Sequence, residues 1–178
     1  MIKFKKIYSK NYILDNFKLS DVSPKYLGWF KDKQVKKDII YSRYNNLNEL
    51  KKFILNNYLR ENNSFFIKIS TLKGIHIGNV RVHNIDLKKS SVFLGILIGD
   101  ENCRNKGIEQ EIIHEVSKFL FKKLKITKIF LGVNKKNKEA LNTYLKLGFT
   151  FENKNKNLMV RDYFLSKLCI GTAQFGSH

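Results

Sequence analysis

Apolar and polar residues recur with two different periods along the chain, and these periods mark where helices and strands are expected. Apolar residues spaced three or four apart predict a helix over Leu47 to Tyr58 and a longer helix from Ile108 to Leu124. Runs rich in β-branched and aromatic residues predict strands over Ser64 to Ser70, His76 to Val82 and Val92 to Ile98. The middle of the chain should therefore hold an antiparallel meander followed by a long helix. Because Val92 to Ile98 is apolar throughout, both faces of that strand are expected to be covered.

Weaker patterns on either side of this region complete the expected fold. Residues 20–23 offer N-cap side chains before Pro24, which predicts a short helix carrying Tyr26, Trp29 and Phe30. The other expected elements are a first strand over Tyr12 to Leu19, a strand over Lys128 to Val133, a helix from Ala140 to Leu147 ending at Gly148, a strand from Phe149 to Phe151 and a closing strand over Leu158 to Leu165. This order predicts a mixed α/β domain, with flanking helices around a central, mostly antiparallel twisted sheet and one parallel crossover.

Length and composition favour one globular domain in a reducing compartment. The 178 residues can bury a core without staples, and no internal repeat or linker divides them, so residues 1–168 are expected to form one domain. Cys103 and Cys169 match no metal-ligand spacing, no metal site is expected, and no segment resembles a signal peptide or membrane span. We therefore expect a cytoplasmic protein.

The formal net charge of +19 raises the alternative of a nucleic-acid-binding protein. The cations are mostly lysines scattered along the chain, whereas specific nucleic-acid readers favour arginine, of which there are few. Nucleic acid is therefore not the expected partner. A small polyanionic cofactor would profit from the same positive field.

The segment from Asp100 to Ile108 joins the buried strand to the long helix and carries the clearest candidate chemistry. Free N–H groups of a helix's first turn bind anions, and Gly107 would allow a phosphate to approach the main chain closely. Arg104 and Lys106 add charge-assisted contacts, and Asn105 tolerates left-handed dihedral angles. A pyrophosphate suits this loop, although a solvated turn with incidental Lys and Gly fits the same residues.

The order of elements and three segments together resemble the GNAT superfamily of acetyl-CoA-dependent N-acetyltransferases. The three segments are Leu94 to Asp100, the sequence Arg104-Asn105-Lys106-Gly107-Ile108-Glu109 in the place of the family's phosphate loop, and Asn137 to Phe149. Over residues 10–168 the layout is most similar to the branch with ribosomal-protein N-terminal and amino-sugar acetyltransferases. The resemblance implies acetyl-CoA as acetyl donor and an amine as acceptor.

The resemblance also implies residue roles. Main-chain groups of Leu97 and Ile98 should pair with the pantetheine arm, the loop from Arg104 to Glu109 should hold the pyrophosphate, and Asn137 should position the cofactor near the thioester. Tyr144 falls where the family places the acid that protonates the leaving thiolate, although a tyrosine at helical spacing also fits a core position. Glu109 departs from the family's Gly or Ala and would repel phosphate unless its side chain turns away or pairs with Lys106.

The acceptor side is less defined by sequence. A base must take the proton of the amine, and His83 is the first candidate, ahead of His76, Asp86 and Glu101. By the family layout, an aromatic and arginine cluster with Trp29, Arg43 and Tyr44 would bind the substrate, and core packing explains part of that cluster equally well.

The residues at the C-terminus, 169–178, do not continue any acetyltransferase element. Their sequence resembles the first barrel strand of aldo/keto reductases, which would fit a truncated fusion and a role in carbohydrate metabolism. The expected function is thus N-acetylation of a small acceptor, a nucleotide-linked amino sugar for surface polysaccharide. Acetylation of a protein N-terminus, an inactive CoA-binding module and nucleic-acid binding stay open as alternatives, as do a homodimer and a fused or associated aldo/keto reductase as partner.

Overall fold

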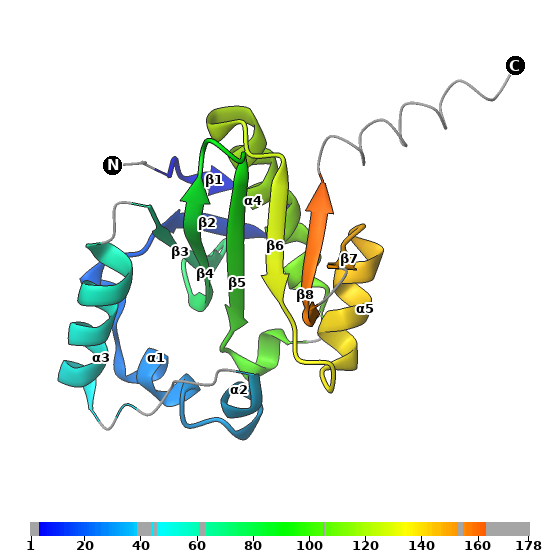
Figure 1. Cartoon of the computed structure of the whole chain (residues 1–178). Coiled ribbons are helices and arrows are strands. Elements are labelled where there is room, and N and C mark those ends of the chain that lie inside the picture. The colour runs from blue at the N-terminus through cyan, green and yellow to red at the C-terminus, as the bar shows by residue number, and fades with distance from the viewer. Residues whose placement is uncertain are drawn as a thin grey trace, which may run out of the picture.

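One sheet organises the part of the chain that the computed structural model describes, residues 4–38, 44, 46–60, 63–104, 106–152 and 155–162. Eight strands lie in the order β1-β2-β3-β4-β5-β6-β8-β7 (Figure 1). The pair β5–β6 is parallel and the other neighbouring pairs are antiparallel. The strands are β1 (Ile7–Tyr8), β2 (Tyr12–Asn16), β3 (Phe65–Thr71), β4 (His76–Asp86), β5 (Ser91–Ile98), β6 (Lys128–Gly132), β7 (Thr150–Glu152) and β8 (Asn155–Asp162). This confirms the predicted mixed α/β fold and its single parallel crossover.

The helices divide between the two faces of the sheet and bury one hydrophobic cluster on each. They are α1 (Pro24–Trp29), α2 (Lys33–Asp38), α3 (Leu47–Ile54), α4 (Ile108–Leu124) and α5 (Lys138–Lys146). Ile112, Val116 and Leu120 of α4 pack on the larger cluster, whereas Tyr26 and Leu50 of α1 and α3 belong to the smaller one. Figure 1 shows α4 behind β5 and β6, with α1 to α3 gathered near the end of β5 that leads into α4. Among the described residues, no helix combines the length and apolar character that a membrane span requires.

Most predicted elements are present, and the differences have local causes. The long helix has the predicted bounds, Ile108–Leu124, and the Ser23 side chain caps α1 by accepting from the Tyr26 N–H. The first strand ends at Asn16, because the chain turns into a 3-10 helix at Leu19–Asp21. The helix expected to reach Tyr58 changes to π geometry after Ile54. The short elements β1 and α2 were not predicted.

The expectation that β5 is covered on both faces was wrong. Val92 and Leu94 are buried against the α4 side, whereas Gly95 is exposed on the opposite side. The apolar sequence hides the alternation, because Phe93 and Leu97 occupy half-buried positions on the side opposite α4, where Leu97 packs against the cluster of α1 and α3. That open face lies beside the site described below.

Gly99 follows β5 and lies directly against Trp29. A Cβ at Gly99 would overlap the indole ring, and Trp29 is only 6% exposed, so the ring has little room to move. We expect Gly99→Ala to lower the free energy of unfolding by about 2–3 kcal/mol, as overpacked cores do. The measurement is urea denaturation. Gly28→Ala is the matched control, because no atom lies within 4 Å of its Cβ and a helical Ala should stabilise by about 0.5–1 kcal/mol. A Gly99→Ala protein as stable as wild type would contradict this packing.

Candidate active site

The two parallel strands at the centre of the sheet separate before β5 ends. Their ladder runs from Ser91 opposite Lys128 to Leu94 opposite Leu131. Residues 95–98 of β5 continue beyond it and, in the described part of the chain, pair only with β4. One edge of β5 therefore presents main-chain groups that no β6 residue satisfies, as Figure 1 shows by the divergence of the two strands.

The direction of these groups follows from the pairing with β4. The Gly99 N–H donates to the Ile77 carbonyl of β4 at 3.0 Å. Main-chain groups of successive residues alternate between the two sides of a strand, so those of Ile96 and Ile98 face the gap and those of Leu97 face β4. Of the two residues predicted to pair with a ligand through their main chain, Ile98 keeps this geometry. The main-chain groups of Leu97 face β4, so Ile96, and not Leu97, is placed to pair with a ligand in the gap.

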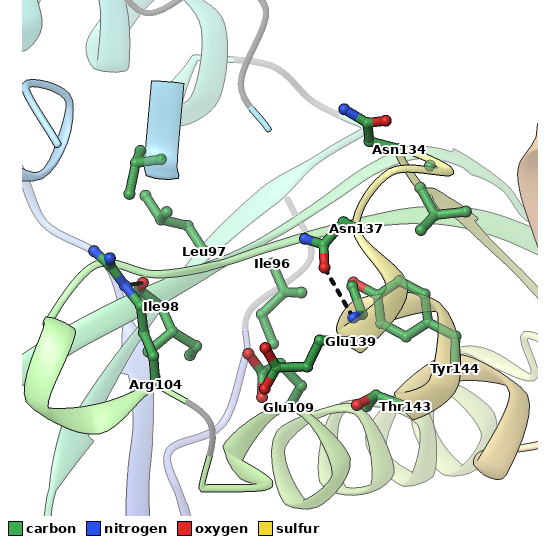
Figure 2. Close-up of a pocket in the computed structure, with 14 residues that line it drawn as sticks. Ile96, Leu97, Ile98, Arg104, Glu109, Asn134, Asn137, Glu139, Thr143 and Tyr144 are labelled. Atoms are coloured by element: carbon green, nitrogen blue, oxygen red, sulfur yellow. Dashed lines mark hydrogen bonds between the residues drawn. The ribbon is translucent and has the colours of Figure 1, made fainter. Parts of the chain in front are cut away.

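A cavity of about 190 Å³ occupies the gap. Side chains from α2, β5, the start of α4, the end of β6 and α5 surround it, and Figure 2 shows carboxylate, amide and phenol groups directed toward one space. Its lining residues are Val35, Ile96, Leu97, Ile98, Arg104, Glu109, Gly132, Val133, Asn134, Asn137, Glu139, Ala140, Thr143 and Tyr144. The described residues contain no group of three or more His, Cys, Asp or Glu side chains arranged to hold a metal ion.

The start of α4 has the form predicted for an anion site. Gly107, the N-cap residue, has φ 69°, a left-handed conformation that most other residues avoid. It brings no side chain to cap the helix. The Gln110 N–H donates to the Gly107 carbonyl at 3.2 Å, and the N–H groups of Ile108 and Glu109 depend on other partners. Ile108 is buried beneath this turn, Lys106 is exposed, and Asn105 lies outside the described residues.

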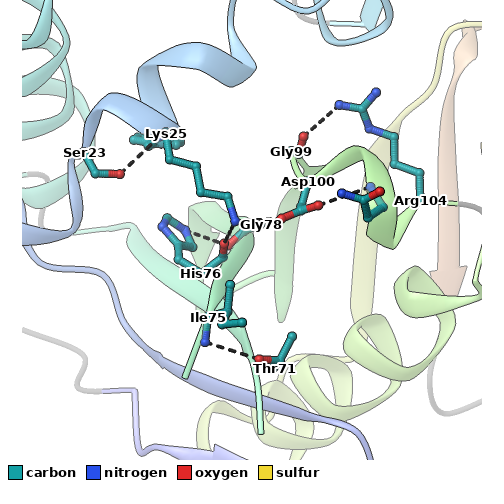
Figure 3. Close-up of polar contacts among 11 residues, drawn as sticks. Ser23, Lys25, Thr71, Ile75, His76, Gly78, Gly99, Asp100 and Arg104 are labelled. Carbon is teal, nitrogen blue, oxygen red and sulfur yellow. Dashed lines mark hydrogen bonds and ion pairs between the residues drawn. The ribbon is translucent and has the colours of Figure 1, made fainter. Parts of the chain in front are cut away.

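Arg104 lies on the cavity wall, but its guanidinium is engaged by the protein. Nε donates to the Ile98 carbonyl at 3.1 Å and Nη2 to the Gly99 carbonyl at 2.8 Å, as Figure 3 shows for Gly99. Nη1 lies 3.3 Å from Asp32 Oδ1, which also accepts from the Val35 N–H at the start of α2. Arg104 therefore joins the end of β5 to α2. The predicted contact with phosphate would require it to leave these partners.

A second tie holds α1 to the same end of β5. Lys25 Nζ lies 2.7 Å from Asp100 Oδ2 and donates to the His76 carbonyl at 3.1 Å (Figure 3). The Lys25 ammonium holds the pKa of Asp100 below its usual value. The wall formed by α1 and α2 is thus attached to the sheet by two ion pairs.

The Arg104–Asp32 pair should couple these elements measurably. Both side chains are largely buried, so we expect a double-mutant cycle of Arg104→Gln and Asp32→Asn to give a coupling free energy of about 1 kcal/mol. Urea denaturation of the four proteins measures it. Additive effects within about 0.3 kcal/mol would contradict a clamp between β5 and α2.

Asn137 and Tyr144, two of the predicted site residues, both line the cavity on its α5 side. Asn137 caps α5, because its Oδ1 accepts from the Ala140 N–H at 3.0 Å, and this fixes the direction of its side chain (Figure 2). Tyr144 is 6% exposed, lines the cavity and lies with its ring centroid 6.1 Å from that of Phe149. The tyrosine is therefore both packed in the core and in contact with the cavity.

Two carboxylates face the same cavity. Glu109 lies at the start of α4 and Glu139 in the first turn of α5, and both line the cavity. Burial raises the pKa of Glu109, and the negative charge of Glu139 raises it further. The sequence drew attention to Glu109 as a departure from the family pattern. It gave no signal for Glu139, which reaches the cavity because Asn137 starts α5 two residues earlier.

The residues proposed for the acceptor side that the structure describes do not line this cavity. His83 lies opposite Phe93 on β4, three positions along the ladder from Ile96, and its ring is 5.7 Å from the Phe93 ring. Trp29 and Tyr44 pack into the cluster of α1 and α3, where Tyr44 contacts Phe30 and Phe53. Arg43 and the tail from residue 169 lie outside the described residues. Val35, Asn134 and Thr143 line the cavity and were not predicted, because nothing in their sequence neighbourhood distinguishes them.

Comparison with known proteins identifies one matching family and several similar structures of proteins described as acetyltransferases. Residues 11–150 match the acetyltransferase (GNAT) domain family. A spermidine N-acetyltransferase from Vibrio cholerae, solved with CoA and spermine, superposes with a TM-score of 0.71 at 18% identity, covering 84% of this chain and 92% of that one. A protein from T. thermophilus that is considered to be an acetyltransferase gives a TM-score of 0.77 at 14% identity, covering 98% and 100%. A search of curated proteins found no match.

The family match spans residues 11–150, which is most of the chain. The chain belongs to the GNAT family of acetyltransferases and is an N-acetyltransferase that takes its acetyl group from acetyl-CoA.

Proposed function

We propose that the gap between β5 and β6 holds the pantetheine arm and that the first turn of α4 holds the pyrophosphate. The observation that carries this is the convergence of two sets of main-chain groups on one cavity. Ile96 supplies an N–H and a carbonyl to the open edge of β5, and Ile98 supplies its N–H, because its carbonyl accepts from Arg104 Nε. Helix α4 begins at Gly107 without a capping side chain. An extended arm with amide groups can hydrogen-bond to such an edge as an additional strand does, and an anion suits such a helix start.

Bound acetyl-CoA supplies a thioester whose carbonyl carbon the acceptor amine attacks. Tyr144, on the cavity wall, is the residue that we propose to donate its phenolic proton to the leaving sulfur. Asn137 accepts from the Ala140 N–H through Oδ1, and we propose that its amide nitrogen donates to a carbonyl or amide oxygen of the ligand. The two residues share α5, which fixes the distance between them.

We propose a nucleotide-linked amino sugar as the acceptor. On the face of the sheet opposite α4, the rings of Phe93 and Phe130 stack with centroids 4.9 Å apart, one residue before the strands separate. Arg81, opposite the exposed Gly95, borders this aromatic pair. Aromatic faces suit the apolar face of a sugar ring, and Arg suits a phosphate.

The same face places the proposed base near the acceptor. His83 contacts Phe93, so an amine held over the aromatic pair would lie on the side of the sheet from which the His83 ring projects. The imidazole has the right chemistry to accept the amine proton near neutral pH. This arrangement separates the two proton transfers, with the base on the open face and Tyr144 on the α5 wall.

A thiol-release assay with acetyl-CoA tests the proposed acceptor. The panel contains nucleotide-linked amino sugars, free amino sugars, peptides with ribosomal-protein N-termini, and spermidine. We expect the highest kcat/KM for the nucleotide-linked sugars and a loss of about tenfold or more in Arg81→Gln for those acceptors alone. A preference for peptides would support the N-terminal acetyltransferase instead. Binding of CoA without turnover of any acceptor would support an inactive module.

A further inference from the structure

Glu109 places a carboxylate of the chain at the anion-binding end of α4. It is the second residue of a 17-residue helix, and it lines the cavity into which the first turn of that helix opens. An acidic side chain at a helix start interacts favourably with the free N–H groups and the helix dipole. Glu109 therefore offers the first turn of α4 an internal anion where the proposed function places the cofactor's pyrophosphate.

The described surroundings of Glu109 favour its neutral form. Burial is the main cause that raises the pKa of Glu109, followed by the charge of Glu139 on α5. The same cavity is also lined by residues 96–98 of β5, by Val35 of α2, and by Val133 and Asn134 after the end of β6. The charged or titratable groups near it are Glu139 and Tyr144 from α5, Arg104 and Lys106 from the loop, Glu111 from α4 and Tyr12 from β2.

The two cationic side chains in the described part of the loop before α4, Arg104 and Lys106, do not point toward Glu109 but toward other partners or solvent. Arg104 is bound to Asp32 and two carbonyls of the β5 end, and the Lys106 side chain is exposed at the surface. Glu111 accepts two hydrogen bonds from Asn11 at 2.8 and 2.7 Å, and its charge is thus held away from the cavity. Glu109 and Glu139 would consequently both repel a pyrophosphate brought into this space.

Resting on the proposed placement of the cofactor, we propose that binding of coenzyme A is coupled to uptake of one proton by Glu109. The proton moves from solvent to a carboxylate oxygen of Glu109, which removes the negative charge beside the first-turn N–H groups that would bind a phosphate oxygen. The neutral carboxyl also gains an O–H that can donate to the pyrophosphate. In the free enzyme the ionised Glu109 carboxylate thus competes with the pyrophosphate for the anion site, and protonation of Glu109 ends this competition.

The sign of the pH dependence follows from linkage. The pKa of Glu109 is raised in the free protein, and an adjacent pyrophosphate raises it further. Between these two pKa values the free protein is ionised and the complex is protonated, so binding takes up a proton and affinity falls as pH rises. The fall approaches about tenfold per pH unit inside that window. Above the pKa of the complex, affinity stays at its lower level.

Isothermal titration calorimetry with dephospho-coenzyme A tests this proposal, since that probe lacks the 3′-phosphate monoester that titrates near about pH 6. Titrations in buffers of different ionisation enthalpy, from about pH 5.5 to about pH 8.5, give the number of protons taken up across the range in which a raised carboxyl pKa would lie. We expect uptake of up to one proton in wild type and none in Glu109→Gln. The variant should also bind about tenfold or more tightly at the upper end of the range. Glu115→Gln is the matched control, with the same charge change on α4 away from the cavity.

The outcomes separate this inference from the proposed function. Binding in wild type with no proton uptake at any pH, and equal affinity in Glu109→Gln, would overturn the inference while leaving the cofactor site intact. Uptake that persists in Glu109→Gln and disappears in Glu139→Gln would overturn the assignment to Glu109. Absence of binding in wild type and in Glu109→Gln alike would count against the cofactor site itself.

Discussion

Tyr144→Phe should lower kcat by about a hundredfold or more, with little change in the dissociation constant of acetyl-CoA. The phenol ring is buried among α5 and Phe149, and phenylalanine keeps that packing, so the variant loses only the hydroxyl on the cavity wall. General acid catalysis typically contributes about 10²- to 10⁴-fold to a rate, and the thiolate would have to leave without it. Steady-state kinetics with the best acceptor, together with calorimetry for the cofactor, measures both quantities.

Tyr12→Phe is the control for this experiment. Tyr12 lies on β2, is partly buried against the α4 side of the sheet and does not line the cavity. Its loss of a hydroxyl should leave kcat within about twofold of wild type, on the small-effect scale of substitutions outside a site. A Tyr144→Phe enzyme that retained more than half of wild-type kcat would show that another group protonates the thiolate.

Gly107→Val should weaken acetyl-CoA binding strongly while changing stability moderately. Gly107 has φ 69°, and a β-branched residue in the left-handed region is strained by roughly 1–2 kcal/mol. Apart from the chain neighbours of Gly107, no atom of the described residues lies within 4 Å of a Cβ at this position, so the new side chain would extend into the space in front of α4. Each charge-assisted contact to phosphate lost at that turn is worth about 1.5–3 kcal/mol, or roughly tenfold to a hundredfold in affinity.

Gly74→Val separates strain from ligand binding. Gly74 also has a left-handed conformation, φ 80°, and open space around its Cβ, but it lies in the turn between β3 and β4. Thermal unfolding should show comparable destabilisation in the two variants, while calorimetry should show weakened cofactor binding in Gly107→Val alone. Equal affinities in both variants would place the pyrophosphate elsewhere than the start of α4.

The elements that could be predicted from sequence are those whose pattern is local. The α4 stripe of Ile112, Val116 and Leu120 and the Ser23 cap before Pro24 depend on residues within one helix. The same holds for Gly107, because a left-handed N-cap favours glycine whatever its surroundings. Features of this kind predict the helices and the candidate anion-binding loop before any tertiary contact is known.

The rest of the site depends on residues far apart in sequence. The sequence of its loop suggests that Arg104 is a phosphate ligand. In the structure its guanidinium donates to Asp32, which is 72 positions away in the sequence. The sequence suggests that Trp29 is a substrate-binding aromatic residue. In the structure Gly99 packs directly against its indole ring, and Trp29 is buried in the core. Glu139 enters the cavity only through the cap at Asn137. Residue spacing in the sequence cannot predict the contacts of Arg104 and Trp29, because these contacts form when α1 and α2 pack on the end of β5.

Thermal unfolding with and without acetyl-CoA tests the central claim most directly, that the gap between β5 and β6 is a cofactor site. A ligand at about 100 times its dissociation constant adds about 2.7 kcal/mol to the folded state, which for a chain of this length raises Tm by roughly 5–10 °C. We expect that rise in wild type and a much smaller one in Gly107→Val at the same concentration. An unchanged wild-type Tm at millimolar acetyl-CoA, at about pH 6 as well as about pH 8, would contradict the account.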